Sequence, residues 1–228
     1  SYKFKMDDRS QGMAVVAGLA DESQWKALRP LLDTTFIAGP YLEKYVLEAY
    51  FMMNDSELGL ARMKKRYQKM VDSELTTLWE GWDIGSATYG GGTYNHGWTG
   101  GPLSLLSGYV AGIKPLTAGY ERYEIKPQLG NLTEVKAKMQ SVSGDIEVEV
   151  MKKNAQTYLV VKSENKGKAM IYVPKNKVSA SKLKLNGVTV FERNKSKKMP
   201  KEMVKISNLT DYFMIETSGK IDLKIVCE

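Results

Sequence analysis

The sequence predicts an α + β multidomain fold, in which α-helical hairpins form part of an (α/α)6 toroid and an antiparallel β-sandwich follows. Two observations predict it. Apolar residues recur at helical spacing through the first half of the 228-residue chain, and strict alternation replaces this spacing in the second half. The change falls near residues 114–120. We therefore expect a helical domain at residues 1–116 and a β domain at residues 117–228.

The first helices follow from local composition. Residues 10–20 are small and mostly apolar, which indicates a buried helix. A second helix is expected to begin at Asp21, with Pro30 causing either a kink or an early end. A third should follow Gly39-Pro40, because proline suits a first helical turn.

Two more helices complete the first half. Ser56 is a plausible N-cap for a fourth helix, which carries an apolar stripe of Leu60, Met63, Tyr67 and Met70. A glycine-rich loop is expected at residues 83–101, and a fifth helix at residues 102–113. A complete toroid of six hairpins needs about twice as many helices, so the helical half should expose faces that another segment covers.

The second half consists of short alternating segments separated by turn signals. Residues 145–150, Asp-Ile-Glu-Val-Glu-Val, alternate strictly between polar and apolar. Further strands are expected at residues 157–163, 169–174, 182–185, 188–192, 212–218 and 220–226. Asn186-Gly187 predicts a type I′ hairpin turn. Many short strands at this spacing are typical of an antiparallel sandwich.

Composition excludes several kinds of function. Cys227 is the only cysteine and stands in an apolar tail, so we expect a buried thiol and no internal disulfide. His96 is the only histidine, which excludes metal motifs that need two. No apolar run approaches the roughly 20 residues of a membrane span.

The net charge of +7 is concentrated in the second half. Residues 118–228 hold 21 of the 33 Lys and Arg residues but only 13 of the 26 Asp and Glu residues. A nucleic-acid surface would combine arginine with aromatic side chains. This half has only two arginines and no tryptophan. We therefore interpret its lysines as a solvated surface that protects strand edges, and expect no nucleic-acid partner.

The densest group of chemically useful residues lies in residues 76–101. This segment holds three of the four tryptophans, the only histidine and two carboxylates, Glu80 and Asp83. Aromatic rings suit the apolar faces of sugars, and neighbouring polar groups fix the orientation of hydroxyls. Tryptophans near a helix end are, however, more often part of a core than a ligand platform, and a lone glutamate is usually on the surface. Composition alone leaves both interpretations open.

Particular motifs in this segment carry a resemblance. Thr76-Thr77-Leu78-Trp79-Glu80-Gly81-Trp82-Asp83, followed by Tyr94-Asn95-His96, resembles the signature of the α-L-rhamnosidases of glycoside hydrolase family 78. Residues 7–11, 39–41 and 110–115 are also similar to that family. The motifs extend over residues 7–127. In architecture the resemblance covers essentially the whole chain, because a helical toroid followed by a β-sandwich is similar to the C-terminal part of such an enzyme.

The resemblance implies a reaction and roles for particular residues. The family hydrolyses terminal α-L-rhamnosyl groups with inversion, and its Trp-Glu-x-Trp glutamate, here Glu80, acts as general base. His96 would contact the rhamnose, and the pocket would be lined by Trp79 and Trp82. Further candidates for substrate binding are Asp83, Asn95 and Trp98. Many members have arginine after the glutamate, where this chain has Gly81.

The resemblance also implies partners. The substrate would be a rhamnose-containing oligosaccharide or glycoside, and the general acid would come from the N-terminal remainder of the same enzyme. No cofactor or metal is implied, because inverting hydrolysis needs two carboxyl groups and water. No membrane partner is expected. The chain begins at Ser1 without a signal peptide, which leaves the compartment open, and a periplasmic or secreted bacterial protein is our interpretation.

Two other functions stay open. The loop aromatics could hold a sugar without cleaving it, as in a non-catalytic carbohydrate-binding module. A related α/α-toroid glycosidase acting on another sugar would share much of the pattern. For the β half we favour a structural role, because a sugar-binding site there would usually have an exposed tryptophan and none follows Trp98.

Overall fold

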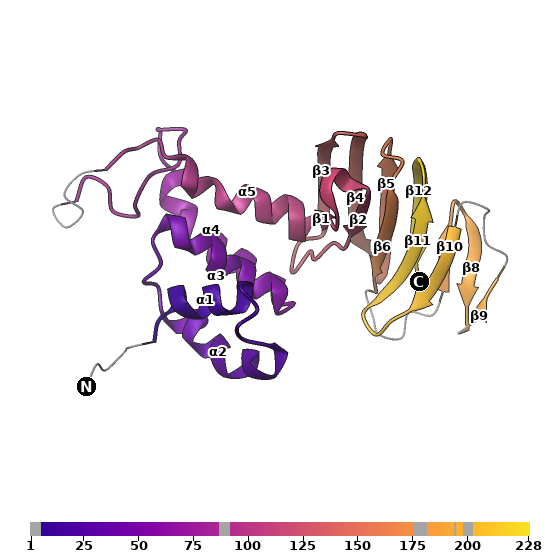
Figure 1. Ribbon diagram of the computed structural model, residues 1–228, viewed down its shortest axis with the longest axis horizontal. Helices are drawn as coiled ribbons and strands as arrows, with labels where there is room; N and C mark the ends of the chain where they lie inside the picture. The colour runs from indigo at the N-terminus through magenta and orange to yellow at the C-terminus, as the bar shows by residue number, and fades with distance from the viewer. Residues whose placement is uncertain (1–5, 87–91, 176–181, 194, 198–202) are drawn as a thin grey trace. The chain divides into compact units, whose positions relative to one another are not determined.

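The computed structural model describes residues 6–86, 92–175, 182–193, 195–197 and 203–228. The chain divides into two compact units, Ser1–Leu105 and Leu106–Glu228. The first unit is helical and the second is built mainly from strands (Figure 1). The predicted succession of helical and β structure is therefore confirmed, while the assignment of the helices to a toroid stays a prediction.

The described part of the first unit contains helices in the expected order, although the first spans Asp8–Val16 and not residues 10–20, and the N-cap of the fourth is Asp55 and not Ser56. They are α1 (Asp8–Val16), α2 (Glu22–Thr34), α3 (Pro40–Met52), α4 (Ser56–Val71), the 3₁₀ turn η1 (Gly97–Gly100) and α5 (Gly101–Leu105). Asp7 caps α1 by accepting hydrogen bonds from the backbone N–H groups of Arg9 and Ser10. Asp21 and Gln24 form a capping box on α2. That helix continues through Pro30 to Thr34, so an early end at the proline is wrong.

The fifth helix is shorter than expected. α5 ends at Leu105, and a π-helical turn, η2, follows at Leu106–Val110. The backbone N–H of Ala111 donates to the carbonyl of Leu106 over 2.9 Å, a five-residue step that widens the turn. The prediction of one regular helix over residues 102–113 is therefore wrong.

Helix α3 is central to the helical unit and contacts α1, α4 and α5. Its contact with α1 is close at Gly12, where a Cβ atom would lie 2.9 Å from the Cα of Val46. On α4, the predicted apolar stripe buries Met63, Tyr67 and Met70. None of the described helices is long and apolar enough to cross a membrane.

A buried cluster of charges connects the helices of this unit. Arg62 on α4 donates to both carboxylate oxygens of Glu43 on α3, over 2.6 and 2.9 Å, and to Asp8 on α1 over 2.5 Å. It also donates to the backbone carbonyls of Leu32 and Thr35. Asp8 in turn accepts from the backbone N–H groups of residues 37 and 38. Pairing of this kind is what allows charges to be buried.

The second unit contains two sheets of short strands. The five-stranded sheet has the order β1-β2-β6-β11-β10, and the seven-stranded sheet has the order β3-β4-β5-β12-β7-β8-β9. The strands are β1 (Ile113–Pro115), β2 (Arg122–Ile125), β3 (Glu134–Ser141), β4 (Gly144–Lys153), β5 (Gln156–Ser163), β6 (Lys168–Pro174), β7 (Lys182–Leu185), β8 (Val188–Glu192), β9 (Lys195–Ser196), β10 (Met203–Asn208), β11 (Tyr212–Ser218) and β12 (Ile221–Cys227). Buried side chains from both sheets form one core, which includes Tyr123, Ile171, Phe213, Leu159 and Ile225.

One strand pair departs from the predicted antiparallel pattern. β2 and β6 run parallel, with Arg122 opposite Lys168 and Ile125 opposite Ile171. The remaining described pairs are antiparallel. The sheets are therefore predominantly antiparallel, which is consistent with a β-sandwich.

The predicted hairpin turn and the predicted buried thiol are both confirmed. Asn186 and Gly187 have φ angles of 47° and 82° between β7 and β8, and two positive φ angles are what a type I′ turn requires. Cys227 is buried at the end of β12. Burial raises the pKa of its thiol to about 11.

Candidate functional site

A hollow of about 320 Å³ in the helical unit contains several of the candidate residues. Three stretches of chain form its walls: the start of α1, the segment that leads into α3, and the Trp-Glu-x-Trp motif together with Trp98. The lining residues are Arg9, Ile37, Gly39, Pro40, Tyr41, Leu42, Glu80, Gly81, Trp82, Asp83 and Trp98. The hollow thus joins two carboxylates to an aromatic wall, a combination that suits a polar ligand with apolar faces.

Glu80 is held at one of its two carboxylate oxygens. Its Oε2 accepts hydrogen bonds from the backbone N–H of Thr93 over 2.9 Å and from the Thr93 hydroxyl over 3.2 Å. Among the described residues, no hydrogen bond to Oε1 is found. The side chain is 26% exposed. Glu80 can therefore present one oxygen to a water molecule or a sugar hydroxyl while the other fixes its orientation.

His96 lies next to this carboxylate. Its Nδ1 atom is 3.7 Å from Glu80 Oε2 and 2.9 Å from the Thr93 hydroxyl. Its ring is 4.0 Å, centre to centre, from the ring of Trp98, which in turn lies 5.3 Å from the ring of Tyr41. His96 itself is not among the residues that line the hollow, but it borders Glu80 and Trp98, which are.

Trp82 is fixed by contacts on its edge and on its face. Its indole N–H donates to the carbonyl of Ala38 over 2.8 Å. The ring of Tyr67 meets it edge-on at 5.1 Å, and the guanidinium of Arg66 lies 4.4 Å from its centre. Arg66 also donates to the Ala38 carbonyl and to that of Phe36. The same basic residue therefore holds both the indole and the segment before α3.

The remaining candidates differ in how far they are buried and in whether they line the hollow. Trp79 is 5% exposed and packs edge-on against Tyr94, so it belongs to the core beneath the motif and does not line the hollow as expected. Asp83 lines the hollow but is largely exposed, 3.9 Å from Lys69. Asn95 is exposed. Residues 87–91 of the glycine-rich stretch lie outside the described residues.

Three residues at the site had no specific role in the sequence interpretation. Arg9 and Tyr41 line the hollow, although the sequence identified them only as parts of similar motifs. Arg9 pairs with Asp7 and thereby lowers the pKa of that carboxyl. Thr93 precedes the aromatic-Asn-His motif by one position, and spacing alone gives no sign that it contacts Glu80.

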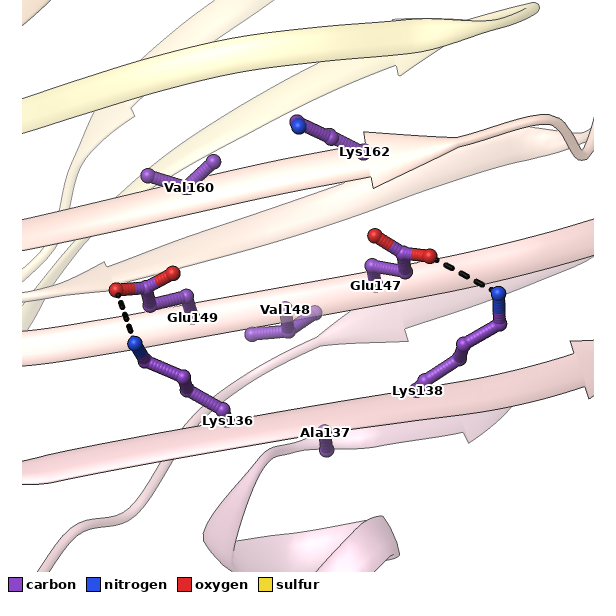
Figure 2. Close-up of a pocket in the computed structure, with 8 residues that line it drawn as sticks. All are labelled: Lys136, Ala137, Lys138, Glu147, Val148, Glu149, Val160 and Lys162. Atoms are coloured by element: carbon purple, nitrogen blue, oxygen red, sulfur yellow. Dashed lines mark ion pairs between the residues drawn. The ribbon is translucent and has the colours of Figure 1, made fainter.

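A second hollow lies on the outer face of the seven-stranded sheet. It has a volume of about 490 Å³ and is lined by Lys136, Ala137, Lys138, Glu147, Val148, Glu149, Val160 and Lys162. Figure 2 shows Lys136 paired with Glu149, and Lys138 with Glu147, across neighbouring strands. Acids and bases are interspersed here, and no aromatic side chain lines the hollow. A solvated, edge-protecting sheet surface accounts for this arrangement.

The second unit carries the sequence match to a known family. Residues 112–187 match the sequence model of the bacterial alpha-L-rhamnosidase C-terminal domain. The chain resembles the C-terminal part of α-L-rhamnosidases. That recognition, expected from the motifs around Glu80 and His96, is thereby confirmed. A comparison with curated protein sequences found no match.

Two solved α-L-rhamnosidases share the fold of this rhamnosidase-like chain. The enzyme from Dictyoglumus thermophilum aligns with 100% of this chain and 26% of its own, with a TM-score of 0.80 and 16% identity. The enzyme from Streptomyces avermitilis, complexed with L-rhamnose, aligns with 97% of this chain and 21% of its own, with a TM-score of 0.70 and 16% identity. The chain thus spans about a quarter of the length of these relatives.

Proposed function

We propose that this chain is the C-terminal part of an inverting α-L-rhamnosidase and that Glu80 is its general base. One observation carries the proposal: Glu80 lines an aromatic-walled hollow and is anchored through a single carboxylate oxygen beside His96. A general base needs this arrangement, because it must be oriented and yet keep a lone pair for the proton of the attacking water.

The neighbouring side chains have separate roles in this proposal. The exposed rings of Trp98 and Tyr41 offer apolar faces against which a sugar ring can lie. His96 contacts a sugar hydroxyl, and Trp82 forms a rigid wall because Ala38 and Arg66 fix it. Fixed walls leave less conformational entropy to lose when the sugar binds.

The second carboxyl group comes from the N-terminal remainder of the enzyme. An inverting hydrolase has a protonated carboxylic acid about 6.5–9.5 Å from its base, so that water fits between them. In the described part of the hollow, the other carboxylate is Asp83, whose side chain is 70% exposed and close to Lys69. Asp83 therefore stands open to solvent beside a cation, and we do not assign it the role of the acid.

The experiment is a stereochemical assay of the complete enzyme on an aryl α-L-rhamnoside. Proton NMR of the first product should show β-L-rhamnose, which then mutarotates. The 228-residue chain alone should release little product, because it lacks the acid. First formation of α-L-rhamnose would contradict inversion, and robust turnover by the isolated chain would contradict a shared site.

The same assay separates the proposed function from its alternatives. A carbohydrate-binding module would bind rhamnose without releasing the aryl group. A toroid glycosidase for another sugar would leave the rhamnoside intact and cleave a different aryl glycoside. A deletion of residues 118–228 that unfolds the protein would support a structural role for the β unit.

A further inference from the structure

Thr93 connects the two polar residues of the site. Its hydroxyl oxygen lies 3.2 Å from Glu80 Oε2 and 2.9 Å from His96 Nδ1. Its backbone N–H also donates to Glu80 Oε2 over 2.9 Å. Thr93 therefore accounts for each hydrogen bond to the Glu80 carboxylate that is found among the described residues.

Counting protons assigns a direction to each bond. A threonine hydroxyl has one hydrogen to donate and two lone pairs to accept with, and an ionised carboxylate can only accept. The hydroxyl of Thr93 must therefore donate to Glu80 if the contact with Oε2 is a hydrogen bond. His96 must then donate from Nδ1 to the Thr93 oxygen. The Nε2 atom of a neutral His96 is left without a proton and can accept a hydrogen bond from a sugar hydroxyl.

We propose that Thr93 is a positioning residue that orients Glu80 and sets the tautomer of His96 through one hydroxyl group. The proposal rests on the proposed function, in which Glu80 is the base and His96 contacts the sugar. Through Thr93, the orientation of the carboxylate and the hydrogen-bonding capacity of the imidazole depend on the same atom.

The backbone around Thr93 is held independently of its side chain. Glu80 donates its N–H to the Thr93 carbonyl over 2.9 Å, and His96 donates its N–H to the Leu78 carbonyl over 2.8 Å. The hydroxyl of Thr77 donates to the carbonyl of Tyr94. Because these bonds do not involve the Thr93 hydroxyl, its removal should leave the two segments in place.

The first test uses NMR on the 228-residue chain, in which His96 is the only histidine. Nitrogen-15 spectra of the imidazole, at a pH where the ring is neutral, report which nitrogen carries the proton. We expect Nδ1–H in the wild type and in Thr93→Ser, and a shift towards Nε2–H in Thr93→Val, which keeps the shape but not the hydroxyl. A wild-type ring protonated at Nε2 alone, or an unchanged ring in Thr93→Val, overturns the proposal.

The second test is kinetic and uses the complete enzyme. Thr93→Val should lower kcat on the order of 10²-fold, the effect of a small misplacement of a reacting group, with a smaller change in KM. Thr93→Ser should remain within a few-fold of wild type. Equal losses in both variants, or no loss in Thr93→Val, overturn the role of the hydroxyl. If Glu80→Gln retains activity, the proposed function fails, while the NMR result still judges the hydrogen bonds of Thr93.

Discussion

Arg62 and Glu43 form a bidentate ion pair inside the helical unit, with nitrogen–oxygen distances of 2.6 and 2.9 Å. The ion pair belongs to a network that also fixes one wall of the hollow. Arg62 also holds the Thr35 carbonyl, and Asp8, which pairs with Arg62, holds the N–H groups of Ile37 and Ala38. These bonds fix the segment whose Ile37 side chain lines the hollow and whose Ala38 carbonyl anchors the Trp82 indole.

Replacing Arg62 should therefore destabilise the helical unit strongly. Arg62→Met leaves Asp8 buried without its cation and leaves Glu43 with only the longer contact to Arg66, at 3.5 Å, among the described residues. Breaking a buried pair in this way costs about 3–5 kcal/mol. The free energy of unfolding can be followed by tryptophan fluorescence, because all four tryptophans precede residue 106. Arg29→Met is the matched control, since Arg29 pairs with Asp33 and Asp55 at partly exposed positions. Comparable losses in the two variants would contradict the importance of the buried pair.

Replacement by alanine should affect substrate binding at one tryptophan of the segment and protein stability at another. Trp98 is 44% exposed beside His96, so Trp98→Ala should raise KM of the complete enzyme and change its stability little. Trp79 is buried, so Trp79→Ala should lower the free energy of unfolding by about 3–5 kcal/mol, the usual loss for a large core aromatic. A rise in KM caused only by Trp79→Ala would reverse these assignments.

Gly112 should not tolerate a side chain. Its φ angle is +78°, and a Cβ atom would lie 2.2 Å from the carbonyl carbon of Lys126 and 2.4 Å from the nitrogen of Pro127. Gly112→Ala should therefore destabilise the β unit far more than Gly219→Ala, where φ is +82° but the added Cβ would have no atom of the described residues within 4 Å. The second change costs only the left-handed strain of about 1–2 kcal/mol. Amide hydrogen exchange of the β-strands measures both, and equal effects would mean that crowding at Gly112 is unimportant.

Cys227 should make the β unit less stable in alkali. The folded thiol has a pKa of about 11 against an ordinary value of 9.0, because burial disfavours the thiolate. Unfolding therefore releases a proton above pH 9, so this contribution to stability is complete below pH 9 and is lost as pH rises towards 11. Wild type should lose stability between these values more steeply than Cys227→Ala. Identical slopes would show that the thiol does not titrate differently in the two states.

The sequence predicted most of the strands that have one buried and one exposed face. Strong alternation identified β4, β5 and β12, and Asn186-Gly187 identified the hairpin between β7 and β8. β3 was missed although Val135, Ala137 and Met139 alternate with polar residues, and these side chains pack only partly buried against the core. The parallel pair of β2 and β6 could not be foreseen, because a pairing between strands more than 40 residues apart leaves no local pattern.

The site could be predicted less completely. The Trp-Glu-x-Trp motif brought Glu80, Trp82 and Asp83 into the hollow, but spacing could not reveal that Trp79 faces the core. The role of Thr93 was not predicted, because its contact with Glu80 joins two residues that are 13 positions apart in the sequence. Hydrogen bonds that close such loops are properties of tertiary structure, whereas periodicity reports only which face is buried.

The most direct test of the account is the turnover of a Glu80 variant in the complete enzyme. Glu80→Gln should reduce kcat on an aryl α-L-rhamnoside by about 10²–10⁴-fold, the usual contribution of a general base, and should still bind rhamnose. Glu74→Gln, at an exposed carboxylate of the preceding loop, is the control and should match wild type.

Azide provides a further test, because the azide anion can attack the anomeric carbon without losing a proton to a base. In Glu80→Ala, azide should restore release of the aryl group and yield β-L-rhamnosyl azide, the inverted product. Near-normal turnover of Glu80→Gln without azide would contradict the assignment of Glu80 as the base.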